Sequence, residues 1–313
     1  MSHRIVILDG FAANPGDLDW KQFEALAPLT VYDRTAPEDT VARIGDADIV
    51  LTNKTRITAE VISACPSIRY IGLLATGYNV VDLDAARARD IPVCNVPAYS
   101  TDAVAQHVFA LLLELTNRVG HHNAQVQAGR WITSRDFCFW DGSLMELRGK
   151  TLGIIGYGQI GQAVARIAEA FGMRVLATAR RARPGLVPME QVLAESDIIT
   201  LHCPLFADNT GMIDRETIAR MKDGVLLINT ARGPLIDEAA LREALLSGKV
   251  AGAAMDVVSV EPMAADCPLL GLDNCVITPH IAWAPTETRA RLLTIAAGNV
   301  RGFLEGHVVN DVR

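Results

Sequence analysis

The 313-residue sequence lacks the features that would mark a membrane or nucleic-acid-binding protein. No apolar run approaches the roughly 20 residues needed to cross a bilayer. Positive charge is not in excess either, because the net charge is −7 at neutral pH. A net anion is not attracted to nucleic acid or to an anionic membrane surface. We therefore expect neither a nucleic acid nor a membrane among its partners.

Cysteine is scarce and shows no metal-binding spacing. The six cysteines include no Cys-x-x-Cys pair, and most stand among apolar neighbours. Reduced core thiols are therefore expected rather than disulfides or a zinc site, and no metal is predicted. The first residues lead into a predicted strand rather than into a signal sequence, so we predict a cytoplasmic protein.

Half of the residues are apolar, which is enough for the cores of two domains. Short apolar runs alternate with helical or polar stretches, a pattern that predicts an α/β fold with parallel sheets. The predicted strands of a first sheet are residues 4–8, 30–32, 48–52, 70–74 and 92–94. Those of a second, larger sheet are residues 152–155, 174–177, 197–201, 225–228, 252–255 and 275–277.

Two amphipathic stretches predict how these sheets are divided between domains. One helix begins near Thr101 and leads out of the first sheet, and another, at residues 286–304, is expected to return to it. We predict two doubly wound, Rossmann-like domains with a cleft between them, which is the expected active site. Residues 1–100 and 286–313 would form a discontinuous substrate-binding domain, and residues 101–285 a dinucleotide-binding domain.

A glycine motif gives the strongest functional signal. Gly156, Gly158 and Gly161 follow an apolar strand and open a helical pattern. The first glycine permits a tight turn, the second lets the backbone approach a pyrophosphate, and the third lets the helix pack on the strand. Free N–H groups at the start of the helix attract phosphates. This βαβ unit predicts a dinucleotide site.

Three residues with catalytic potential are predicted to lie just after the ends of strands of the same domain, where ligands bind in such sheets. Arg232 stands before a stiff Gly-Pro turn and suits a bidentate grip on a carboxylate. His280 can donate and accept a proton at a carbonyl, and Glu261 can fix the tautomer of its imidazole and stabilise the protonated form. Each alone is compatible with a structural role, and only the combination predicts catalysis.

The residue that follows the second strand of the glycine unit indicates the cofactor. NAD-binding sites have an acid here that accepts hydrogen bonds from the ribose, whereas this chain has Ala179, followed by Arg180, Arg181 and Arg183. An uncharged residue next to arginines favours a 2′-phosphate. We predict a preference for NADP(H), with NAD(H) possible. The alternative is that these arginines face water and the pocket accepts both cofactors.

Residues 129–141 form an irregular, aromatic segment before the glycine motif. Its residues 137–140 are predicted either to pack in the core or to join a homodimer interface. In the second case Trp140 would limit the substrate pocket to small substrates. Trp283 is a second candidate for the pocket wall, with core packing as the alternative.

At this point the chain resembles the D-isomer-specific 2-hydroxyacid dehydrogenases, over about residues 5–306. The resemblance is carried by the glycine motif, residues 197–205, residues 229–233, Glu261 and the Pro279-His280 pair. Within that family the chain is most similar to glycerate dehydrogenases and hydroxypyruvate or glyoxylate reductases, through residues 51–54, 75–79, 136–141 and 279–283.

The resemblance implies reduction of a 2-keto acid, with hydride transfer from a nicotinamide cofactor. His280 would protonate the keto oxygen, Glu261 would keep His280 protonated and oriented, and Arg232 would hold the carboxylate. Lys54, with the N–H groups of Thr76 and Gly77, would complete the substrate site. The expected cofactor-binding residues are Thr101, Gly156, Gly158, Gln159, Ile160, Gly161, Ala179, Arg180, Arg181, His202, Cys203, Pro204, Thr230, Ala231, Arg232, Asp256, His280 and Ala282.

Two other functions stay open. One is a non-catalytic protein that senses NAD(P) and exchanges partners, like the corepressors of this family. The other is an NAD-dependent dehydrogenase for a different 2-keto acid. The preferred prediction is an NADP(H)-dependent reductase of glyoxylate and hydroxypyruvate that acts as a cytoplasmic homodimer.

Overall fold

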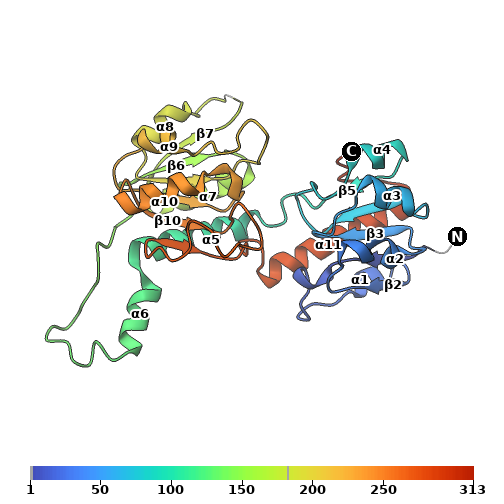
Figure 1. Ribbon diagram of the computed structural model, residues 1–313, viewed down its shortest axis with the longest axis horizontal. Helices are drawn as coiled ribbons and strands as arrows, with labels where there is room; N and C mark the ends of the chain where they lie inside the picture. The colour runs from blue at the N-terminus through green and yellow to red at the C-terminus, as the bar shows by residue number, and fades with distance from the viewer. Residues whose placement is uncertain (1–2, 182) are drawn as a thin grey trace. The chain divides into compact units, whose positions relative to one another are not determined.

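The computed structural model describes residues 3–181 and 183–313, so the first two residues of the predicted domain 1–100 lie outside it. The chain forms two compact units, Met1–Ser100 with Trp283–Arg313, and Thr101–Ala282 (Figure 1). The second unit ends at Ala282, before the predicted end at residue 285. The physical reason is that Trp283 packs against the hydrophobic core of the first unit.

The first unit contains a five-stranded parallel sheet with the order β2-β1-β3-β4-β5. Its strands are β1 (Ile5–Ile7), β2 (Leu29–Val31), β3 (Ile49–Thr52), β4 (Tyr70–Leu73) and β5 (Val93–Cys94). Because β2 and β3 lie on opposite sides of β1, the direction in which successive strands are added to the sheet reverses between β1 and β3. This is the topological switch point of the unit.

Short α- and 3-10 helices complete the described part of the first unit before its last helix. They are η1 (Gly10–Ala12), α1 (Lys21–Glu24), η2 (Pro37–Asp39), α2 (Thr40–Ile44), α3 (Ala59–Ala64) and α4 (Leu83–Ala88). The last helix, α11 (Thr286–Leu304), buries Leu292, Ala296 and Val300 against residues of β1, β3 and β4. The end of the chain thus returns to the sheet that its beginning forms, as the amphipathic pattern predicted.

The second unit contains a six-stranded parallel sheet with the order β11-β10-β9-β8-β6-β7. Its strands are β6 (Thr151–Ile155), β7 (Arg174–Thr178), β8 (Ile198–Leu201), β9 (Val225–Asn229), β10 (Val250–Met255) and β11 (Cys275–Ile277). Its helices are α5 (Thr101–Asn117), α6 (Val119–Gln127), α7 (Gln159–Ala170), α8 (Met189–Glu195), α9 (Arg215–Ala219), η3 (Gly233–Leu235) and α10 (Glu238–Ser247). The switch point lies between β6 and β8.

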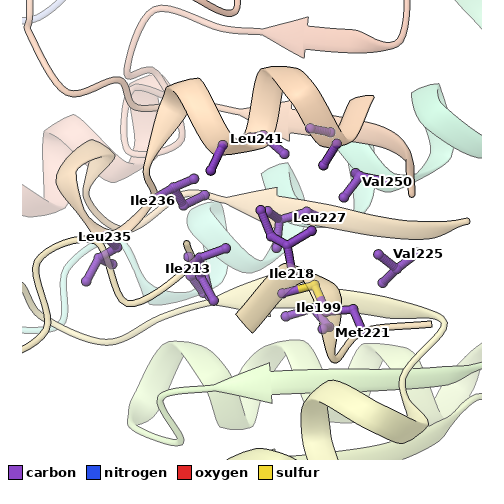
Figure 2. Packing of buried hydrophobic residues seen from close by; sticks show 14 of the residues in the cluster. Ile199, Ile213, Ile218, Met221, Val225, Leu227, Leu235, Ile236, Leu241 and Val250 are labelled. Carbon is purple, nitrogen blue, oxygen red and sulfur yellow. The ribbon is translucent and has the colours of Figure 1, made fainter. Parts of the chain in front are cut away.

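Both faces of the central strands β6, β8 and β9 are buried, which explains why these strands are largely apolar. Along β9, Leu227 joins the cluster with α9 and α10, whereas Leu226 and Ile228 join the cluster with α5 and α7. Figure 2 shows the first of these clusters, which brings Leu227 and Ile199 of the sheet together with Leu241 and Ile218 of the helices. The carboxyl ends of the strands are therefore held by a rigid core.

One segment of the second unit stands away from its sheet in the described part of the chain (Figure 1). It comprises α6 and the residues that follow it, and we refer to residues 129–141 as the arm. Ile132 is 87% exposed, Phe137 90% and Trp140 63%. The alternative that residues 137–140 pack in the core is therefore wrong for Phe137 and Trp140, because within the described chain no element covers these side chains.

Candidate active site

His280 and Glu261 form a direct pair at one edge of the second sheet. His280 Nδ1 lies 2.7 Å from Glu261 Oε2, and both side chains are about one-third exposed or less. A carboxylate only accepts hydrogen bonds, so Nδ1 carries the proton. Nε2 is then the atom at which His280 can exchange a proton with a ligand.

The turn that carries Arg232 lies against the loop that carries Glu261. A Cβ on Gly233 would stand 2.0 Å from the backbone of Val258, so the two loops touch backbone to backbone. Val258 N in turn donates to Glu261 Oε1 at 3.3 Å. Glycine at position 233 therefore allows the loop that carries Arg232 to lie directly against the loop that carries Glu261.

Asn229, at the end of β9, holds the Arg232 turn. It is fully buried, its Nδ2 donates to Arg232 O at 2.8 Å, and its Oδ1 accepts from Ala231 N at 2.9 Å. The guanidinium of Arg232 is exposed and donates from Nη1 to Ala231 O. This role of Asn229 was not predicted, although a polar residue that ends an apolar strand was a usable signal.

Asp256, at the end of β10, fixes the backbone around His280. Its carboxylate accepts from Thr278 Oγ1 at 2.6 Å and from the N–H groups of Ile281 and Ala282 at 2.9 Å, while its carbonyl accepts from His280 N at 2.7 Å. His280 has a φ of +55°, in the left-handed region. Asp256 therefore clamps an unfavourable backbone conformation at the candidate catalytic residue.

His107 of α5 extends this clamp and was also missed. Its Nε2 lies 3.0 Å from Thr278 Oγ1 and 3.4 Å from Asp256 Oδ1. Burial alone would raise the pKa of Asp256, but hydrogen bonds from His107, Thr278 and the nearby N–H groups outweigh it and hold that pKa below its usual range. Asp256 therefore stays ionised, which keeps it an acceptor for the His280 loop.

The glycine motif has the geometry that a bound dinucleotide requires. Gly156 has a φ of +101°, and a Cβ there would stand 2.5 Å from Cys203 N, across the switch point. A Cβ on Gly161 would stand 2.2 Å from Gly156 O, so the helix packs directly on the turn. Around Gly158, apart from its own neighbours along the chain, no heavy atom of the described residues lies within 4 Å of the Cβ position, which leaves open space for a ligand.

Other candidate cofactor residues surround this switch point. Burial lowers the pKa of His202 to about 3 and raises that of the Cys203 thiol, so both side chains are neutral at physiological pH. The buried Thr230 Oγ1 has no hydrogen-bond partner among the described residues, as expected where a ligand would supply one. A nicotinamide cofactor therefore fits the residues present, and Gln159, Ile160, Pro204, Ala231 and Ala282 lie in the same turns and strand ends.

Ala179 directly follows β7, where a ribose-binding acid would otherwise stand. Arg180 is exposed, and its Nη2 lies 2.9 Å from Asp208 Oδ2. Its guanidinium carbon is 5.2 Å from the centre of the Phe206 ring. Arg180 thus contacts the loop after β8 while its side chain stays 70% exposed, and Arg181 beside it is exposed as well, so the alternative that these arginines face water stays open.

The remaining predicted site residues belong to other parts of the chain. Lys54 and Thr76 are exposed at the carboxyl ends of β3 and β4 in the first unit, and Gly77 follows Thr76. Within the described residues, the N–H groups of Thr76 and Gly77 make no hydrogen bond. Trp283 is partly buried in the first unit, Trp140 lies on the arm, and Thr101 begins α5.

The comparisons with known proteins agree with this geometry. Residues 109–282 match the family described as D-isomer specific 2-hydroxyacid dehydrogenase, NAD binding domain. The chain belongs to this family. It is accordingly an NAD(P)-dependent oxidoreductase of 2-hydroxy acids, and the predicted family, fold class and enzyme class are confirmed.

Relatives of known name span almost the whole chain. It is 54% identical to a hydroxypyruvate reductase of Blautia hydrogenotrophica, over 99% of both proteins. It is 39% identical to a glycerate dehydrogenase of Methylorubrum extorquens, over 100% of this chain and 99% of that protein. Among solved structures, an acyclic imino acid reductase in complex with NADPH and D-Arg is 31% identical, with a TM-score of 0.85 over 99% of this chain and 100% of the other.

Two structural features bear on membranes and metals. In the described part of the chain, no helix combines the length and apolar character needed to span a membrane. Residues 3–181 and 183–313 also contain no group of three His, Cys, Asp or Glu side chains arranged to hold a metal ion. All six cysteines lie in these ranges and are unpaired.

Proposed function

We propose that this dehydrogenase prefers NADPH and reduces small 2-keto acids, glyoxylate to glycolate and hydroxypyruvate to D-glycerate. The observation that carries the proposal is the His280–Glu261 pair, which leaves Nε2 of His280 as a proton donor beside the loop of Arg232. The names of the relatives support the substrate class, since they include a hydroxypyruvate reductase and a glycerate dehydrogenase.

In the proposed reaction, a reduced nicotinamide supplies a hydride for the keto carbon. His280 donates the proton from Nε2 to the keto oxygen, so that the carbonyl becomes a hydroxyl group. Glu261 stabilises the protonated imidazole through the bond to Nδ1 before the transfer. Asp256 keeps the imidazole in place because it fixes the backbone on both sides of His280.

Arg232 serves the substrate in this proposal. Its planar guanidinium matches a carboxylate in a bidentate arrangement and stabilises negative charge that develops on the keto oxygen. Lys54 and the unpaired N–H groups of Thr76 and Gly77 supply further contacts to the carboxylate. Trp140 and Trp283 are proposed to restrict the substrate to small 2-keto acids.

The NADPH preference rests on the end of β7. Ala179 offers no negative charge to repel a 2′-phosphate, and the guanidinium groups of Arg180 and Arg181 attract it. A relative of the same fold that was solved with NADPH supports this assignment. The residues of the glycine motif would hold the pyrophosphate, and Thr230 and Asp256 would face the nicotinamide end.

The test is a set of initial rates with glyoxylate and with hydroxypyruvate, each with NADPH and with NADH, on the wild type and on Ala179→Asp. We expect the wild type to have the higher kcat/KM with NADPH. In Ala179→Asp the kcat/KM with NADPH should fall about 10- to 100-fold, since the new carboxylate repels the 2′-phosphate. Activity with NADH should be retained.

Three outcomes would contradict parts of this proposal. Equal or better kcat/KM with NADH in the wild type refutes the cofactor preference. Rapid turnover of another 2-keto acid alone refutes the substrate class. Tight NADPH binding without turnover of any 2-keto acid supports the non-catalytic sensor instead.

We also propose that the arm forms the interface of a homodimer. Its base is closed by Asp141, which binds Arg130 at 2.5 and 2.9 Å and His121 at 2.8 Å, while its apolar tip remains exposed. Exposed apolar side chains on a projecting segment favour association with a second copy of the chain.

We expect sedimentation analysis to find a dimer for the wild type and a monomer for the double variant Ile132→Asp, Phe137→Asp. Val119→Asp, on α6 outside the arm, is the control and should stay dimeric. In the same series, Trp140→Ala should raise the activity with phenylpyruvate relative to glyoxylate. A dimer that survives the double variant would refute this role of the arm.

A further inference from the structure

The first unit has a switch point of its own. Its sheet order is that of flavodoxin-like folds, which bind their ligand outside the carboxyl ends of the strands at the point where the order reverses. Here that point lies between β1 and β3. Asp9 lies two residues after the end of β1, and residues 53–55 directly follow β3.

Three consecutive backbone N–H groups converge there on the carboxylate of Asp9. Asn53 N donates to Oδ1 at 2.7 Å, while Lys54 N and Thr55 N donate to Oδ2 at 2.5 and 2.8 Å. The hydroxyl of Thr52 lies 3.2 Å from Oδ1. Such a run of N–H groups is an anion-binding nest, and in this chain the anion is a side chain of the protein itself.

These hydrogen bonds fix the backbone of Lys54. A carboxylate offers about four acceptor positions, and three or four are used by the nest. The carboxylate of Asp9 therefore has few acceptor positions left for a ligand. Its hydrogen bonds instead hold the backbone of residues 53–55. Lys54 lies at the middle of the three bonded residues, so its Cα is held at the carboxyl end of β3.

Two buried asparagines continue the connection along the same edge of the sheet. Asn53 Nδ2 donates to Leu74 O at 2.7 Å, which links the end of β3 to that of β4. Asn95 Nδ2 donates to Thr76 O at 2.8 Å, and Thr76 Oγ1 donates to Val96 O at 2.7 Å, which link β4 to the segment after β5. Lys54 and Thr76 are therefore parts of one hydrogen-bonded edge that begins at Asp9.

We propose that Asp9 is a positioning residue of the substrate site, a built-in anion that holds Lys54 and, through Asn53, the loop of Thr76 in the arrangement that binds a carboxylate. The inference rests on the proposed function for the identity of the substrate. Asp9 does not touch the substrate, and its effect is exerted through the backbone of residues 53–55.

The test is Asp9→Ala with sodium formate as a replacement anion and sodium chloride as the ionic-strength control. We expect the KM for glyoxylate to rise about tenfold, the factor of one lost charge-assisted hydrogen bond, with a smaller change in kcat. Formate should lower this KM because it fills the emptied nest. In the wild type, formate should only raise the KM, since it competes with the carboxylate of the substrate.

Asp82→Ala is the matched control in the same unit. Asp82 also accepts a backbone N–H, from Ala85 at 2.9 Å, but it caps α4 and makes no bond to residues 53–55. Its loss should lower Tm and leave the KM unchanged, with or without formate. A folded Asp9→Ala protein with the wild-type KM, or with a raised KM that formate does not lower, overturns the inference.

The melting temperature separates this inference from the proposed function. Formate should raise the Tm of Asp9→Ala by more than that of Asp82→Ala or of the wild type, in which it can bind only the substrate site. If the wild type reduces neither 2-keto acid, the proposed function is wrong, whereas a larger formate-dependent rise in the Tm of Asp9→Ala still supports the nest. An equal rise in all three proteins refutes the nest whatever the activity.

Discussion

His280→Asn is expected to lower kcat for glyoxylate reduction by about 10²–10⁴-fold, the usual contribution of a positioned general acid. Nε2 of His280 is the proposed proton donor, and asparagine has no titratable group that replaces it. Asparagine is preferred to alanine here because it tolerates the left-handed φ of +55° at this position. The measurement is the initial rate with NADPH at saturating substrate.

Two further variants make this result specific. Glu261→Gln keeps an acceptor oxygen for Nδ1 but removes the charge, so kcat should fall less, by about 10- to 100-fold. His307→Asn replaces an exposed histidine of the first unit and should leave kcat unchanged. If His280→Asn retained most of the wild-type kcat, the proton would have to come from another group and the proposed mechanism would be wrong.

Arg232→Ala is expected to lower kcat/KM by about 10³-fold, because two charge-assisted hydrogen bonds to the substrate carboxylate and the polarised carbonyl are lost together. Arg232→Lys should recover only part of this loss, since an ammonium group cannot make the bidentate contact. Added guanidinium should partly restore the activity of Arg232→Ala. The measurement is kcat/KM for glyoxylate with NADPH in each variant.

Arg215→Ala is the matched control for the loss of an arginine. Arg215 is an exposed arginine of the same unit that pairs with Glu243 on the surface, and its removal should change kcat/KM by less than about twofold. Activity of Arg232→Ala close to that of Arg215→Ala would show that Arg232 has no role in substrate binding.

The strands and the long helices were predicted closely because their signals are local. β11, α5 and α11 begin at the predicted residues, and the glycine turn follows β6 directly. Apolar runs bounded by turns specify such elements without reference to distant residues. β10 begins at Val250 rather than at residue 252, since Gly252 and its neighbours pair with β9 through an irregular register that only the partner strand defines.

The sequence identified the functional residues, but it did not predict how their side chains contact one another. His280, Glu261 and Arg232 were selected because each follows a strand or loop of one domain. Their contacts depend on the backbone approach at Gly233 and on the Asp256 clamp, neither of which has a signal near His280 in the sequence. The roles of Asp9, His107 and Asn229 were missed for the same reason. Each of these side chains forms hydrogen bonds with a loop whose position only the folded structure defines.

The sequence by itself determined the α/β class, the two sheets, the glycine turn and the family, because periodicity and motif spacing act over a few neighbouring residues. The tertiary structure alone decided which strand ends lie side by side, that Nδ1 of His280 faces Glu261, that Asp9 fills the nest of residues 53–55, and that the arm is exposed. The physical reason is that parallel pairing brings the carboxyl ends of distant strands to one edge, where hydrogen bonds form between residues that the sequence separates widely.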